Sequence, residues 1–230
     1  MDSLDYTNAP QTLEDNPFYG LKLDDEQKAF RDAIWDDSKL IVFADALAGT
    51  GKTTVATMTA NLLRLYRRYE GIVYIASPVQ ESRLGYLPGD ANQKAEAYFE
   101  PFIQAAIRAN INPMTAINQR ASIDAQKEGS TYIDCLTHVF LRGVNFSKKV
   151  ILIDEAQNYS VSELKKTLTR CADDCKVVII GNTIQCDLNN SSMSGFGKYI
   201  KHFEGDPRCA VCHLTKNYRG WISSHADQLI

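Results

Sequence analysis

The sequence lacks any hydrophobic run that would cross a membrane. Within its 230 residues, no apolar stretch approaches the ~20 residues that a transmembrane helix requires. Residues 1–19 are polar and acidic, without the basic start and apolar stretch of a secretory signal. We therefore expect no membrane partner, a cytoplasmic location and reduced thiols at all six cysteines.

An excess of positive charge is also absent. The chain has 25 Lys and Arg against 28 Asp and Glu, which gives a formal net charge of −3. Without a global basic field, any nucleic-acid site must be a local patch. The hydrophobic fraction of 44% and the charged fraction of 23% are those of a globular protein with a packed core.

Internal repeats and low-complexity tracts are missing too, so the sequence marks no internal domain boundary. Residues 1–22 carry several turn formers and little hydrophobic periodicity, which is typical of an extended arm. We therefore expect one domain over residues 23–230, preceded by this arm.

Two pairs of cysteines have spacings that a zinc site can use. Cys171 and Cys175 are one pair, and Cys209 and Cys212 are the other. The first pair begins where a predicted helix ends, and the second flanks a short strand-like run. We favour ordinary packed thiols over a four-thiolate zinc site.

Apolar strands alternate with amphipathic helices along the chain. The predicted strands are 39–44, 72–76, 131–136, 150–153, 177–180 and 210–213, and the predicted helices are 24–35, 52–69, 93–110 and 160–171. Residues 77–93 are a turn-rich connection, and residues 113–129 are partly helical. Continuously apolar strands in this alternation indicate an α/β fold, a mostly parallel sheet with helices on both faces.

The strongest motif is a glycine-rich loop between the first predicted strand and its helix. Residues 46–53 read Ala-Leu-Ala-Gly-Thr-Gly-Lys-Thr. Backbone N–H groups of such a loop, with the helix N-terminus, bind the phosphates of ATP. Lys52 would reach the β- and γ-phosphates, and the Thr53 hydroxyl would ligate Mg²⁺. The predicted nucleotide-binding residues here are Ala48, Gly49, Thr50, Gly51, Lys52, Thr53 and Thr54.

One position departs from the usual loop pattern, because Ala46 replaces the first glycine. A glycine-rich turn that only caps a helix is the alternative. The agreement of strand, loop, Lys-Thr and helix favours the phosphate loop.

A second motif, Asp-Glu-Ala-Gln at 154–157, follows the apolar run 150–153. Ligands of such folds bind at the carboxyl ends of the strands. Asp154 is then placed to hold Mg²⁺ through a water, and Glu155 to orient or deprotonate the attacking water. Alternatively, both carboxylates simply open a loop and cap the next helix.

Three weaker signals complete the predicted site. Gln185, after the fifth strand, would contact the γ-phosphate, unless residues 181–185 are a plain polar loop. Gln27 can pair with the adenine edge, but Asp24 and Gln27 also read as a helix capping box. Arg142 and Arg219 are candidates for an arginine finger, although each can be an ordinary surface or salt-bridge arginine.

These motifs together resemble the PhoH family, ATPases related to superfamily 1 helicases. The resemblance covers about residues 22–230 and includes Leu-Gly-Tyr-Leu-Pro-Gly at 84–89, Arg-Gly at 142–143 and Gly-x-x-x-Gln-x-Asp-Leu at 181–188. Its most distinctive part is the connection 81–89 with Tyr-Phe-Glu-Pro at 98–101. Besides Ala46, Ser77 stands where the family usually has arginine, and Asn182 where aspartate is usual.

The resemblance implies a single RecA-like core, ATP hydrolysis and assembly as a hexameric ring, with RNA unwinding or remodelling in some members. The length of the chain favours a homo-oligomer independently. Related helicases complete the ATP site with a second RecA-like lobe, and 230 residues have no room for one or for an appended nuclease. A neighbouring subunit would then supply the missing finger head-to-tail, and such contacts close as rings.

The leading hypothesis is Mg²⁺-dependent ATP hydrolysis coupled to remodelling or unwinding of single-stranded RNA or DNA. Candidate phosphate contacts, each also an ordinary solvated charge, are Arg142, Lys148, Lys149, Lys165, Lys166 and Arg170. One alternative is a nucleotide-dependent switch with low turnover, which Ala46 and Asn182 support. Another is a small-molecule kinase, which Glu155 disfavours because an activated water would waste ATP.

Overall fold

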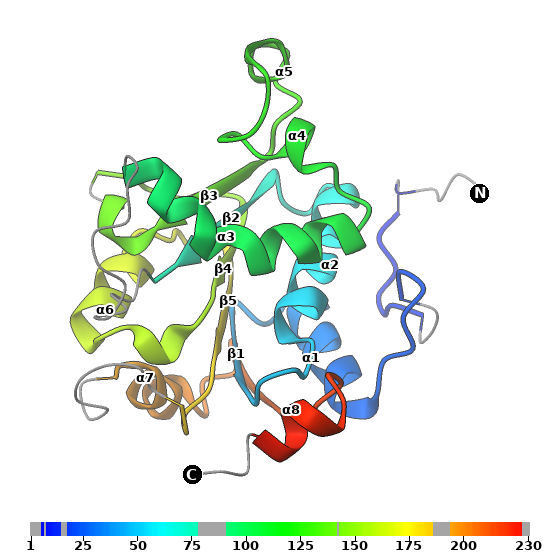
Figure 1. Cartoon of the computed structure of the whole chain (residues 1–230), viewed down its shortest axis with the longest axis vertical. Coiled ribbons are helices and arrows are strands. Elements are labelled where there is room, and N and C mark those ends of the chain that lie inside the picture. The colour runs from blue at the N-terminus through cyan, green and yellow to red at the C-terminus, as the bar shows by residue number, and fades with distance from the viewer. Residues whose placement is uncertain are drawn as a thin grey trace.

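The computed structural model describes residues 6, 8–14, 18–77, 91–141, 143–185 and 194–226 (Figure 1). Its centre is a six-stranded sheet in the order β3-β2-β4-β5-β1-β6. The strands are β1 (Ile41–Ala46), β2 (Gly71–Ala76), β3 (Ile133–Thr137), β4 (Lys149–Ile153), β5 (Lys176–Gly181) and β6 (Cys209–Leu214). Every pairing between them is parallel, which confirms the predicted sheet.

Alternation along each central strand divides the core into two halves. In β1, Val42 and Ala44 pack into one apolar cluster, whereas Ile41 and Phe43 pack into the other. Successive side chains of a strand point to opposite faces, so a strand covered on both sides must be apolar throughout. The unbroken apolar runs in the sequence have this origin.

Helices cover both faces of the sheet. Figure 1 shows α1 and α2 on one side of the sheet and α6 and α7 on the other. The α-helices are α1 (Asp25–Trp35), α2 (Lys52–Leu65), α3 (Ala91–Arg108), α4 (Pro113–Ala116), α5 (Ile123–Lys127), α6 (Val161–Leu168), α7 (Phe196–Phe203) and α8 (Trp221–Ala226), and the 3₁₀ turns are η1 (His138–Phe140) and η2 (Ala156–Asn158). No helix in the described part of the chain is both long and apolar enough to span a bilayer.

The α/β RecA-like expectation is confirmed, but several predicted boundaries are wrong. Helix α2 ends at Leu65 instead of residue 69, because Arg67 adopts a left-handed backbone with φ of 56°. No glycine marks this stop, so the sequence carried no signal for it. Helices α7 and α8 were not predicted at all, and Cys209 and Cys212 lie within β6 instead of flanking a strand.

The described parts of the N-terminal arm pack against α1 and α2. The Trp35 indole Nε1 donates to the Pro10 carbonyl at 3.1 Å, and Arg31 Nη1 donates to the Glu14 carbonyl at 2.9 Å. Asn61 Nδ2 of α2 donates to the Tyr19 hydroxyl at 3.1 Å. The arm therefore lies on the helical layer; the division of the chain at residue 22 stays a prediction.

Candidate nucleotide site

Three neighbouring strands bring the predicted site residues to one edge of the sheet. The order β4-β5-β1 places the segments after these strands side by side, since all three strands run in the same direction. These segments are residues 46–51, 154–158 and 181–185, and they contain the glycine loop, the carboxylate pair and the predicted γ-phosphate contact.

The glycine loop joins β1 to α2. Gly49 and Gly51 have φ of 74° and 80°, a left-handed backbone that glycine adopts without strain. Ala46 is the last residue of β1 and pairs with Leu214, so its position has extended backbone and needs no glycine. Lys52 Nζ donates to the Leu47 carbonyl at 3.4 Å, within the same loop.

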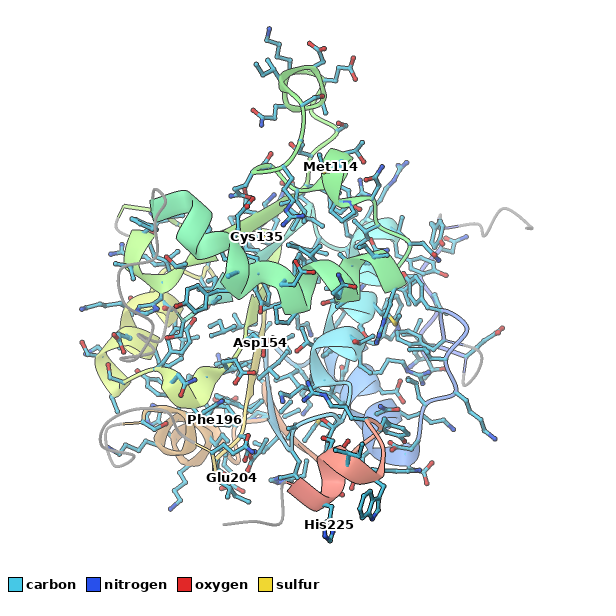
Figure 2. All side chains as sticks on the ribbon, in the orientation of Figure 1. Met114, Cys135, Asp154, Phe196, Glu204 and His225 are labelled. Carbon is cyan, nitrogen blue, oxygen red and sulfur yellow. The ribbon has the colours of Figure 1, made fainter. Side chains whose placement is uncertain are left out.

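Asp154 sits at the end of β4 with 2% of its surface exposed. Figure 2 labels it near the centre of the molecule. Its Oδ2 accepts the Thr53 hydroxyl at 2.9 Å and the Tyr74 hydroxyl at 3.1 Å, and its Oδ1 accepts the Glu155 backbone N–H at 2.9 Å. Three donors from separate parts of the chain therefore fix the carboxylate, and its Oδ2 faces the hydroxyl of Thr53 in the first turn of α2.

The donor set around Asp154 fits a hard divalent cation. Mg²⁺ prefers oxygen ligands, and the Thr53 hydroxyl and the Asp154 carboxylate are both of that kind. Burial and the Asp154 charge raise the pKa of Tyr74 well above its usual range, so its hydroxyl stays protonated and donates. Tyr74 was missed in the sequence, where its only mark is a hydroxyl within an apolar strand.

Glu155 follows Asp154 in a left-handed conformation, with φ of 51° and ψ of 43°. This backbone costs a non-glycine residue about 1–2 kcal/mol. The Glu155 side chain is exposed, and its Oε2 accepts the Gln157 Nε2 amide at 2.5 Å. Gln157 was not predicted as a site residue, although it stands only two residues beyond Glu155.

The turn after β5 is tied to both neighbouring strands. Gln157 Oε1 accepts the Asn182 backbone N–H at 3.1 Å, on the β4 side. On the β1 side, Asp45 accepts the Thr183 N–H at 2.9 Å and the Thr183 hydroxyl at 2.7 Å. Gln185 is exposed at the end of this described segment, and its contact with a γ-phosphate stays a prediction.

A segment after β6 lies against the glycine loop. The Tyr218 N–H donates to the Gly49 carbonyl at 2.9 Å. A Cβ at Gly49 would lie 2.5 Å from Asn217 Oδ1 and 3.1 Å from Arg219 Cγ. The segment thus holds Arg219 beside the phosphate loop of its own chain, and its role as an arginine finger stays a prediction. Arg142, the other candidate finger, lies outside the described residues.

Gln27 joins α1 to the same loop. Its backbone N–H donates to Asp24 Oδ1 at 2.8 Å and its Oε1 accepts the Asp24 N–H at 3.3 Å, which confirms the capping box. Its Nε2 donates to the Thr50 carbonyl at 2.8 Å, and the residue is 8% exposed. Gln27 therefore contacts the phosphate loop; its pairing with adenine stays a prediction.

The cysteines considered for zinc lie in apolar surroundings. Burial raises the pKa of Cys171 to about 12 and that of Cys212 to about 11, so both carry protons at neutral pH. Within the described ranges, no three or more His, Cys, Asp and Glu side chains gather as metal ligands.

A glycine loop between the first strand and α2, with a carboxylate from β4 facing its threonine, defines the class of P-loop proteins with a RecA-like core. The family model described as "PhoH-like protein" matches residues 22–220, and this chain belongs to that family. The family resemblance read from the sequence is confirmed.

Individual proteins of this family are similar to the chain in sequence. The chain is 28% identical to Protein PhoH of Escherichia coli strain K12 over 181 residues, which cover 78% of this chain and 49% of that protein. It is 32% identical to a PhoH-like protein of Mycobacterium leprae strain TN over 171 residues, covering 74% of this chain and 46% of the relative. The chain thus spans about half the length of these relatives.

Among solved structures, the UvsW helicase from bacteriophage T4 has a similar fold. The TM-score is 0.50 at 14% sequence identity, and the match covers 84% of this chain and 60% of the helicase chain. At this identity the likeness concerns the fold alone.

Proposed function

We propose that this chain hydrolyses ATP in the presence of Mg²⁺ and uses the hydrolysis to remodel or unwind single-stranded nucleic acid, RNA in the first place. The observation that carries the ATPase proposal is the 2.9 Å contact between Thr53 Oγ1 and Asp154 Oδ2, which joins residues 101 apart. Membership of the PhoH-like family supports it.

Each residue of the candidate nucleotide site has a separate role in this proposal. The loop N–H groups and the α2 N-terminus bind phosphate oxygens, and Lys52 adds a cation toward the β- and γ-phosphates. Thr53 and Asp154 would hold Mg²⁺, which neutralises phosphate charge when bound. Glu155 orients or deprotonates the attacking water. Gln185 and Arg219 would contact the γ-phosphate, and Gln27 the adenine edge.

Binding of a nucleic-acid strand is the less direct part of the proposal. Lys165 and Lys166 are exposed on α6, the helix that follows the Asp154–Glu155 loop. Lys148 is exposed as well and lies 3.4 Å from Glu70. These side chains offer phosphate contacts in a chain of net charge −3, so strand binding should weaken steeply as salt rises.

We also propose a cytoplasmic protein that assembles as a homo-oligomer, a hexameric ring. Light scattering with and without a non-hydrolysable ATP analogue tests the assembly. A monomer under both conditions, at concentrations that support turnover, would exclude the ring.

Phosphate release measured with Mg²⁺ or with excess chelator, and with or without single-stranded RNA or DNA, tests the function itself. We expect Mg²⁺-dependent turnover that a strand stimulates. Lys52→Ala should abolish it, and Glu155→Gln should lower kcat by about 10²–10⁴-fold. Absent turnover would refute the ATPase, whereas turnover that no strand stimulates would remove only the nucleic-acid part.

A further inference from the structure

The Gln157 side chain crosses from the β4 loop to the turn after β5. Its Nε2 donates to Glu155 Oε2 at 2.5 Å, and its Oε1 accepts the Asn182 N–H at 3.1 Å. Gln157 is only 4% exposed, whereas Glu155 is exposed. A buried amide therefore connects the carboxylate proposed to act on water with the backbone of the turn after β5.

The Gln157 side chain packs tightly between Gly181 and its neighbours. A Cβ at Gly181 would lie 3.0 Å from Gln157 Oε1 and 2.9 Å from Phe196 Cε1. Only glycine at this last residue of β5 leaves room for the crossing. Phe196, the first residue of α7, is fully buried and closes the other side.

The turn at the far end of Gln157 is itself anchored. Thr183 is held by Asp45, the β1 residue that directly precedes Ala46 and the glycine loop. Asn182 Oδ1 accepts the Ile184 N–H at 2.9 Å, which shapes the turn. Hydrogen bonds on both sides of the Asn182–Thr183 peptide thus connect β1, the strand before the phosphate loop, with the Glu155 carboxylate.

We propose that Gln157 is a positioning residue for Glu155, one that holds the carboxylate in a fixed direction relative to the 182–185 turn. This inference rests on the proposed ATPase function. The hydrogen bond of Gln157 to the Asn182 N–H fixes the amide, and the amide in turn holds the Glu155 carboxylate in one direction.

The residue type fits this task. An amide presents a donor to the carboxylate and an acceptor to the backbone N–H at the same time. A methionine of similar length offers neither, and a glutamate would set a second negative charge beside Glu155. Bonds to a charged acceptor are also the stronger kind, which suits a contact that must hold an exposed side chain.

The test is a double-mutant cycle on phosphate release, with Gln157→Met, Glu155→Gln and the double variant. A buried amide far from Glu155 supplies the control: Asn61 in α2 is 5% exposed, and its Nδ2 donates to the Tyr19 hydroxyl and the Ala109 carbonyl. We expect Gln157→Met to lower kcat about 10–100-fold, since a misplacement near 1 Å costs about that much. KM for ATP and the Kd for a fluorescent ATP analogue should stay within about twofold. Asn61→Leu should leave kcat within about twofold.

The decisive comparison is in the Glu155→Gln background. If Gln157 acts through Glu155, adding Gln157→Met should lower kcat by less than about twofold further. The positioning role would be overturned if the kcat losses of the two single variants add in the double variant, or if Gln157→Met alone leaves kcat unchanged. In either case, turnover by the wild type would still support the ATPase proposal. Full turnover of Glu155→Gln would overturn both the base assignment and this inference, and an inactive wild type would refute the proposed function itself.

Discussion

Replacing Tyr74 with phenylalanine removes one hydroxyl from the interior of the candidate site and little else. The Tyr74 ring stacks on Phe102 at a centroid distance of 4.6 Å, and phenylalanine preserves that contact. What is lost is the 3.1 Å bond to Asp154 Oδ2. A hydrogen bond to a charged group contributes about 1.5–3 kcal/mol to the free energy of unfolding, and we expect a loss in that range.

The effect on metal use should be more specific than the effect on stability. Groups that hydrogen-bond a metal ligand orient it, and their removal costs about 10–100-fold in metal affinity. In a Mg²⁺ titration of phosphate release at saturating ATP, Tyr74→Phe should raise the half-maximal Mg²⁺ concentration by that factor. The maximal rate at high Mg²⁺ should recover most of the wild-type value.

Tyr159→Phe is the matched control. Tyr159 is also fully buried, and its hydroxyl donates to the Ile75 backbone carbonyl at 3.3 Å instead of the carboxylate. It should lose about 1 kcal/mol of stability with no change in Mg²⁺ dependence. Equal Mg²⁺ dependence in the two variants would refute the reasoning, because the Tyr74 bond would then have no bearing on the metal.

Three further results are expected. Gly49→Ala should abolish nucleotide binding, because the added Cβ would collide with the segment after β6. The control is Gly129→Ala, at φ of 66° in open space, which should cost about 1 kcal/mol of stability and leave nucleotide binding intact. Equal nucleotide affinities of the two variants would contradict the prediction. Burial lowers the pKa of Lys176 from 10.5 to about 8. The unfolded state then binds more protons between these two values, so the Lys176 contribution to stability should rise with pH across that window. The urea midpoint of the wild type should therefore rise relative to that of Lys176→Met as the pH increases across this window. A midpoint difference that does not change with pH would contradict the lowered pKa of Lys176. Arg219→Ala should lower kcat about 10³-fold or more, and mixing it with Lys52→Ala protein should restore no activity if the arginine serves its own loop; recovery on mixing would place the arginine in a neighbour's site.

Much of the fold follows from patterns that the sequence displays. The parallel sheet was predictable because strands covered on both faces must be apolar throughout, as Ile72–Ala76 is. The meeting of Thr53 and Asp154, 101 residues apart, follows from the rule that ligands gather at the carboxyl ends of parallel strands. These inferences needed only periodicity and strand direction.

Other elements were predictable but missed. Helix α7 has buried or partly buried side chains at Phe196, Tyr199, Ile200 and Phe203, the spacing of one helical face. Helix α8 lacks such a signal, because Trp221 and Ile222 are both more than 70% exposed. The left-handed stop at Arg67 has no marker residue, and only the surrounding packing determines it.

The polar side chains behind the site could not be found from sequence because their roles depend on cross-chain contacts. Tyr74 reads as a core aromatic until the structure sets its hydroxyl beside Asp154. Gln157 reads as part of a loop until its two ends are seen on Glu155 and on Asn182. Local patterns identify the groups that bind or react, whereas the groups that orient them appear only when distant strands are assembled.

The position of Arg219 bears on whether a neighbouring subunit must supply the arginine finger. The sequence predicts a ring because a single RecA-like lobe would take its arginine finger from a neighbouring subunit. Here the segment that carries Arg219 is fastened to its own chain at two points: Tyr218 N–H bonds to the Gly49 carbonyl, and Thr215 bonds through N–H and hydroxyl to Glu26 at 2.6 and 2.8 Å. If Arg219 is the finger, we expect it to act on the phosphate loop of its own chain. A homo-oligomeric ring would then not be needed to supply the finger, which the mixing experiment with Arg219→Ala and Lys52→Ala tests directly.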